Sequence, residues 1–102
     1  NDVQIDGHTT EVKQVRPLDT KLSAFGWQTR TVDGHDLKAL LGALSVDARP
    51  VGRPLAVVAQ TVMAKGVAFM EDDPKWHGGS ITEDEAGRAL KELGAADGLE
   101  DF

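Results

Sequence analysis

The sequence contains no cysteine among its 102 residues. This absence excludes disulfides, thiolate metal sites and a cysteine nucleophile, and it suits a cytoplasmic enzyme. Basic residues are also scarce, because 11 Lys and Arg face 17 Asp and Glu, which leaves a formal net charge of -6. Binding along a nucleic-acid backbone needs a positive field that displaces counterions. We therefore expect no nucleic-acid partner.

Long apolar runs are absent as well. No run approaches the length that crosses a bilayer, and the first residues lack the basic and apolar regions of a signal peptide. We therefore expect a cytoplasmic protein without a membrane partner. The sequence does not begin with Met, which we interpret as a chain that starts within something larger. The length predicts one globular unit.

Segments typical of strands alternate along the chain with segments typical of helices. Residues 27–32 are short and rich in β-branched side chains, and residues 55–59 form an apolar run typical of a strand covered on both faces. Residues 3–5, closed by an Asp-Gly turn, resemble the end of a strand. Apolar residues recur at helical spacing in three places, namely Leu18, Leu22 and Phe25 after Pro17; Leu37, Leu40, Leu41 and Leu44 after Asp36; and Ala86, Ala89, Leu90 and Leu93 after Thr82. This alternation predicts an α/β fold, with a parallel sheet flanked by helices.

Residues 61–80 show no clean period, and a loop of this length in a compact domain is usually functional or disordered. His77 lies near its end, after Trp76 and before two glycines that let the backbone approach a ligand closely. From the residues alone, a merely exposed histidine is the better explanation of this pattern. We interpret His8 and His35 as capping or solvated residues in polar turns.

Acidic side chains gather at residues 71–73 and again at residues 83–85. The first run lacks the alternating ligand spacing of a calcium loop, so we interpret it as a solvated acidic turn. The second run lies in the first turn of a predicted helix, where negative charge complements the helix dipole. Among the large aromatic residues we expect Trp27 in the core, and Phe69 and Trp76 in either the core or an interface.

Four segments, in their order and spacing, resemble transketolases. They are residues 1–7 (Asn-Asp-Val-Gln-Ile-Asp-Gly), 24–27 (Ala-Phe-Gly-Trp), 32–35 (Val-Asp-Gly-His) and 71–78 (Glu-Asp-Asp-Pro-Lys-Trp-His-Gly). The likeness is closest to the separately encoded amino-terminal subunits of bacterial two-part transketolases. It implies that residues 1–94 are the C-terminal part of a thiamine-diphosphate-binding domain and that residues 95–102 are an acidic tail.

The resemblance also implies thiamine diphosphate and a divalent metal, Mg²⁺ or Ca²⁺, as cofactors. Asn1 matches the family's metal-binding Asn, and Val3 matches the residue that gives a backbone carbonyl to the metal. His77 matches the histidine that reaches the cofactor diphosphate and the substrate, so it is expected to be catalytic and cofactor-binding. Met63 occupies a cofactor-binding position that is often Lys, although Met cannot donate a hydrogen bond. Ala64 replaces a common Gly, which would restrict the loop.

The implied reaction transfers a two-carbon ketol unit between sugar phosphates, with the cofactor carbanion carrying out the bond cleavage. The family's Gly-Asp-Gly metal motif is absent from these residues. The implied partners are therefore the remainder of the amino-terminal domain and a pyrimidine-binding transketolase chain, in an oligomer. Two alternatives stay open: a related two-carbon transferase subunit of a secondary pathway, and a non-catalytic binding or assembly module on the same fold.

Overall fold

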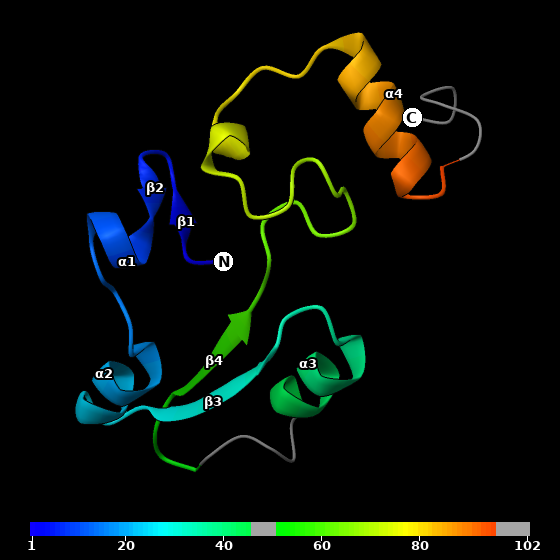
Figure 1. Cartoon of the computed structure of the whole chain (residues 1–102). Coiled ribbons are helices and arrows are strands. Elements are labelled where there is room, and N and C mark those ends of the chain that lie inside the picture. The colour runs from blue at the N-terminus through cyan, green and yellow to red at the C-terminus, as the bar shows by residue number, and fades with distance from the viewer. Residues whose placement is uncertain (46–50, 96–102) are drawn as a thin grey trace. The chain divides into compact units, whose positions relative to one another are not determined.

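The computed structural model describes residues 1–45 and 51–95, and Figure 1 shows the order of the elements along the chain. The chain divides into two compact units. Unit 1 combines residues 1–12 with the residues from Val62 onward, and unit 2 is Lys13–Thr61. The predicted acidic tail lies, from residue 96, outside the described residues. Within the described ranges, no helix is both long enough and apolar enough to cross a membrane.

Unit 2 is built on two parallel strands, β3 (Gln28–Asp33) and β4 (Leu55–Gln60). Parallel strands need a crossover connection, and α3 (Leu37–Leu44) lies within it. Both α3 and the preceding helix α2 (Leu18–Ala24) pack against the two strands (Figure 1). This arrangement confirms the predicted α/β class with parallel strands and flanking helices.

Helix starts follow the capping residues that the sequence indicates. Asp36 accepts hydrogen bonds through Oδ1 from the backbone N–H groups of Lys38 (2.9 Å) and Ala39 (3.0 Å) at the start of α3. At the start of α4 (Glu83–Glu92), Thr82 and Glu85 form the predicted capping box. Each cap satisfies backbone donors that have no partner within the helix. Both predictions are confirmed. Such caps can be predicted from the sequence because they join residues only a few positions apart.

The buried face of α3 differs from the predicted leucine face. Leu37 and Leu41 are 74% and 72% exposed, whereas Ala43 is only 5% exposed. Arg30 of β3 donates a hydrogen bond from Nη1 to the carbonyl oxygen of Ala43 at 3.2 Å. The helix therefore approaches the strands through its small side chains, and the prediction was wrong for most of the leucines. Leu40 alone among them is half-buried.

Several apolar positions of unit 2 are less covered than the sequence predicts. Trp27, which we expected in the core, is 39% exposed, and Phe25, expected on the packed face of α2, is 82% exposed. In β4 the first four side chains are half-buried, and Ala59 is exposed. A sheet of the two described strands is too narrow to cover a large residue at the end of a strand. It also leaves part of β4 uncovered.

Unit 1 begins with a hairpin in place of the end of a longer strand. β1 (Val3–Gln4) pairs antiparallel with β2 (Gly7–His8), so that His8 lies in a strand and not in the predicted polar turn. The short helix α1 (Thr9–Val12) follows. The core of this unit includes Val3 and Val67, which are 6% and 5% exposed. Farther along, the 3-10 helix η2 (Pro74–His77) contacts β1.

Candidate cofactor site

All four residues predicted for the cofactor and metal site lie in unit 1. Asn1 and Val3 belong to the first segment of this unit, and Met63 and His77 belong to its second segment. The contact between β1 and η2 joins these two segments. The structure thus brings together two regions that lie far apart in the sequence, as a site shared between them requires.

The residues predicted to bind a metal, Asn1 and Val3, lie at the start of the chain. Asn1 is exposed, and its Oδ1 accepts a hydrogen bond from the backbone N–H of Val3 at 3.0 Å. An amide oxygen has two lone pairs, so this bond leaves Oδ1 able to bind a cation. Amide and carbonyl oxygens suit Mg²⁺ or Ca²⁺, which take about six oxygen ligands. Residues 1–45 and 51–95 contain no group of three or more His, Asp or Glu side chains that could hold a metal.

A turn held by local hydrogen bonds follows β4 and carries Met63. The Met63 carbonyl oxygen accepts from the backbone N–H of Asp72 at 3.1 Å, and Glu71 accepts through Oε1 from the backbone N–H of Gly66 at 2.8 Å. Ala64 has a φ of +53°, in the left-handed region that favours glycine. The turn therefore has a glycine-like conformation at the position where the resemblance implies a Gly.

The acidic side chains of residues 71–73 make specific contacts within unit 1, so they are not simply a solvated turn. Asp72 Oδ1 lies 3.9 Å from Nδ1 of His8, which links the second segment of unit 1 to β2. Asp73 accepts through Oδ1 from the backbone N–H of Lys75 at 3.0 Å and so caps η2. These two carboxylates therefore stabilise the segment that leads to His77.

His77 ends η2 and is exposed, in agreement with a side chain that can reach a ligand. The preceding Trp76 donates from Nε1 to the carbonyl oxygen of Phe69 at 3.2 Å. After His77 the chain passes close to its own backbone, because a Cβ added at Gly79 would lie 2.7 Å from the carbonyl oxygen of Lys75. Glycine is therefore required at position 79 for steric reasons. The Trp76 hydrogen bond and this close approach restrict the backbone before and after His77.

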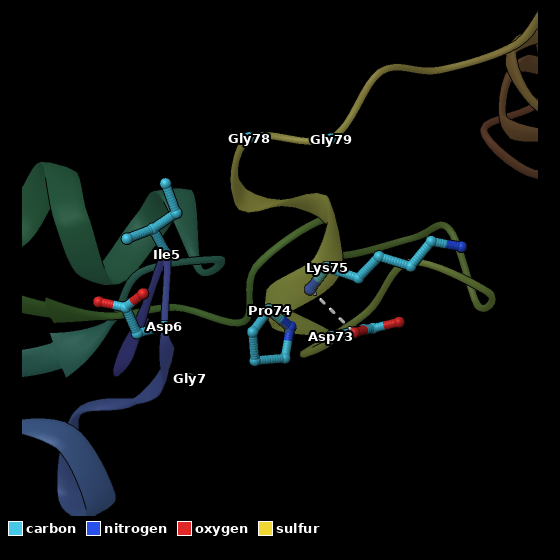
Figure 2. A pocket seen from close by; sticks show the side chains of 8 residues that line it. All are labelled: Ile5, Asp6, Gly7, Asp73, Pro74, Lys75, Gly78 and Gly79. Atoms are coloured by element: carbon cyan, nitrogen blue, oxygen red, sulfur yellow. Dashed lines mark hydrogen bonds between the residues drawn. The ribbon is translucent and has the colours of Figure 1, made fainter.

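A hollow of about 520 Å³ lies between the hairpin and η2 (Figure 2). Its wall is formed by Ile5, Asp6, Gly7, Asp73, Pro74, Lys75, Gly78 and Gly79. His77 directly precedes two of these glycines but does not line the hollow itself. The hairpin side of this wall could not be predicted from the sequence. The Asp-Gly dipeptide indicated a turn, but only the folded chain shows that the turn faces η2.

Parallel strands joined by a helix define an α/β protein. The candidate residues lie outside that sheet, on short elements and turns of unit 1. The sequence model described as "Transketolase, thiamine diphosphate binding domain" matches residues 1–100. The chain belongs to this family, which confirms the resemblance found in the sequence and supports thiamine diphosphate as the cofactor.

Curated relatives include two proteins that are named as subunits. The chain is 34% identical over 93 residues to the 6-deoxy-6-sulfo-D-fructose transketolase subunit SqwG of Clostridium sp. (strain MSTE9), covering 91% of this chain and 34% of that protein. It is also 34% identical over 93 residues to an apulose-4-phosphate transketolase subunit of Actinobacillus succinogenes, covering 91% of this chain and 33% of the relative. The chain thus spans about a third of the length of these relatives.

A solved structure agrees on the fold. The transketolase of Campylobacter jejuni superimposes on 92% of this chain with a TM-score of 0.80, and the match uses 15% of that protein at 24% identity. Similarity at this level establishes the shared fold. It does not assign roles to individual residues.

Proposed function

We propose that this chain is a component of a thiamine-diphosphate-dependent transketolase that transfers a two-carbon ketol unit between sugar phosphates. The observation that carries the proposal is the contact between β1 and η2, which joins the segments of Asn1, Val3 and His77 within a family match spanning residues 1–100. We propose residues 1–94 as the C-terminal part of the cofactor-binding domain and residues 95–102 as an acidic tail.

Each candidate residue has a role that its chemistry allows. The Asn1 side chain and the Val3 carbonyl would hold Mg²⁺ or Ca²⁺, together with oxygens from outside this chain. His77 would donate a hydrogen bond to the diphosphate and to substrate oxygens and would move a proton there. Met63 would offer the cofactor an apolar contact, because its thioether cannot donate. Thiamine diphosphate, when bound, supplies the electron sink for cleavage of the carbon–carbon bond.

The remaining ligands require other polypeptide segments. Two oxygen donors from this chain fall well short of the number that these cations take. The relatives that are named as subunits support an assembly of more than one chain. We propose that the partners are the remainder of the amino-terminal domain and a pyrimidine-binding transketolase chain, in a cytoplasmic oligomer.

A second candidate function follows from the names of the relatives. One is named for a sulfonated fructose and the other for apulose 4-phosphate, so both are named for sugars outside the ordinary hexose and pentose phosphates. A two-carbon transferase subunit of a secondary pathway would use the same residues and differ in its acceptor or donor sugar. Comparing the turnover of a sulfonated sugar, of apulose 4-phosphate and of ordinary sugar phosphates by one assembly would separate the two candidates.

The test is reconstitution of this chain with the missing part of the domain and the partner chain, followed by measurement of cofactor binding and ketol transfer. His77→Ala is expected to lower turnover by about 100-fold or more, since positioned acid–base groups contribute roughly that much. His35→Ala is the matched control, because His35 is exposed in a turn of unit 2.

Unchanged turnover in His77→Ala would remove this histidine from the reaction. A reconstituted assembly that binds thiamine diphosphate but transfers no two-carbon unit from any sugar phosphate or sulfonated sugar would instead support the non-catalytic binding or assembly module.

A further inference from the structure

A row of aromatic and cationic side chains lies next to His77 in unit 1. The rings of Phe69 and Trp76 meet edge to face, with centroids 5.7 Å apart and planes inclined by 80°. The Arg88 guanidinium of α4 lies 4.2 Å from the centre of the Phe69 ring, and Lys75 Nζ lies 4.6 Å from the centre of the Trp76 ring. Each ring therefore has one aromatic neighbour and one cation, both favourable arrangements.

Trp76 is attached to this row at two points. Its Nε1 donates to the Phe69 carbonyl oxygen at 3.2 Å, and its ring packs on the Phe69 ring. Both residues are half-buried, so the hydrogen bond is partly protected from competition with water. Two attachments restrict the rotation of the indole more than either does alone. The backbone of Trp76 is therefore fixed relative to the turn that precedes η2.

The short helix cannot hold His77 in place by itself. η2 has four residues, and a 3-10 helix of this length has few internal hydrogen bonds and poor bond geometry. Asp73 caps its first turn by accepting from the backbone N–H of Lys75, two residues before His77. The position of the exposed His77 therefore depends on its neighbours. Among them, Trp76 is the residue directly before it whose side chain is anchored.

We propose that Trp76 is a positioning residue that sets the place of His77 through its hydrogen bond and ring contact with Phe69. Arg88 supports this arrangement from α4 by holding the Phe69 ring. The inference rests on the proposed function, because it assumes that His77 acts on the bound cofactor or substrate. It adds a role for Trp76, Phe69 and Arg88 that is exerted through the position of His77.

The test is a double-mutant cycle in the reconstituted assembly. Trp76→Phe keeps an aromatic ring but removes the N–H donor, and Trp76→Leu removes both attachments. Each is measured alone and combined with His77→Ala, through kcat, KM and the Kd of thiamine diphosphate. If Trp76 acts through His77, Trp76→Leu lowers kcat about tenfold when His77 is present and changes it little when His77 is already Ala.

Trp76→Phe is expected to give a smaller loss in the same direction and is the variant to rely on if Trp76→Leu fails to fold. Trp27→Phe is the matched control, since it makes the same substitution at the chain's other Trp, in unit 2. Its kcat is expected to stay within twofold of the parent assembly. Trp27→Phe also leaves Trp76 as the one Trp of the 102-residue chain, so quenching of its fluorescence by iodide reports how closely Trp76 is packed.

Losses that multiply independently in the double mutants would overturn the inference, because they would show that Trp76 contributes stability without acting through His77. Strong quenching of Trp76 by iodide in the folded chain would also overturn it. If His77→Ala itself has no effect, the proposed role of His77 fails first, and that failure is visible before any Trp76 variant is made. A large effect of His77→Ala with none from either Trp76 variant leaves the proposed function intact and rejects the positioning role.

Discussion

Ala64 is the residue whose backbone conformation conflicts most clearly with its side chain. At a φ of +53° the Cβ of an L-residue crowds its own backbone, whereas glycine adopts this region readily. We expect Ala64→Gly to raise the free energy of unfolding by up to about 1 kcal/mol, after the greater freedom of Gly in the unfolded chain is subtracted. Urea denaturation of the 102-residue chain measures the change.

The control for Ala64→Gly is Ala89→Gly, within α4. Here the backbone is helical, so the same substitution is expected to lower the free energy of unfolding by about 0.5–1 kcal/mol. A loss of stability in both variants would contradict the argument, because it would mean that the left-handed conformation at residue 64 carries no cost for Ala.

Residue-level predictions from the sequence succeeded where the interaction is local. Asp36 and Thr82 cap their helices as predicted, since a cap depends on backbone N–H groups two or three positions away. The exposure of Trp27 could not be predicted, because burial depends on how many strands lie beside it. His77 could be singled out only through its resemblance to the family. The contact of Trp76 with Phe69 could not be predicted either, because Phe69 lies in an aperiodic segment whose contacts the sequence pattern does not indicate.

The first turn of α4 gives a prediction for the dependence of stability on pH. Hydrogen bonds from the backbone N–H of Thr82 (2.9 Å) and from its hydroxyl (2.8 Å) hold the pKa of Glu85 below its ordinary value of 4.5. Because the folded pKa is the lower one, the ionised carboxylate stabilises the folded chain. This contribution is complete above pH 4.5 and is lost as the pH falls through the folded pKa.

We therefore expect Glu85→Gln to lower the Tm at pH 7, with the difference from the parent chain shrinking as the pH falls below about 4.5. Thermal unfolding followed by circular dichroism between pH 3 and pH 7 measures it. Glu83→Gln is the control, because Glu83 carries the same charge in the same helix turn without closing the capping box. A difference for Glu85→Gln that stays constant over this range would contradict the assigned cause.

Helix α3 gives a second element-level prediction, which separates its two faces. Ala43 is 5% exposed against the strands, so Ala43→Leu is expected to overpack this contact and to cost about 1–3 kcal/mol. Leu41 is 72% exposed, so Leu41→Lys is expected to change stability by less than about 0.5 kcal/mol. Chemical denaturation of the 102-residue chain compares them. The reverse order would mean that the leucine face is the packed one.

The elements themselves were largely predictable, but their faces and partners were not. The parallel strands and α3 follow from hydrophobic runs and spacing, because period and length are properties of one segment. The hairpin at the start was missed because each of its strands has two residues, and His8 gives no apolar signal. The leucines of α3 fit the helical period. That period alone does not show which face of the helix packs against the strands, and in the structure the small residue Ala43 is the buried one.

At the scale of the whole molecule, the proposed metal site predicts how the assembly responds to metal removal. EDTA is expected to release thiamine diphosphate from the reconstituted assembly, and added Mg²⁺ is expected to restore binding. Asn1→Ala removes one oxygen ligand, so it should raise the Mg²⁺ concentration needed for half-maximal cofactor binding by about tenfold or more. Titration of cofactor binding against Mg²⁺ provides the measurement.

Asn1→Asp is the matched control, because it keeps an oxygen that can accept from the Val3 N–H and bind the cation. It should need much less Mg²⁺ than Asn1→Ala. Equal Mg²⁺ requirements in the parent and in Asn1→Ala would exclude Asn1 from the metal site.

Unit 1 is assembled from both ends of the described sequence, with Lys13–Thr61 lying between its two segments. Its hairpin cannot meet η2 until the intervening chain has been synthesised, and closing a flexible loop of that length costs about 3 kcal/mol of entropy. Unit 2 is continuous and can fold first, which shortens the loop that remains to be closed. Substitutions that slow the folding of β3, α3 and β4 would therefore delay formation of the proposed cofactor site without changing any of its residues.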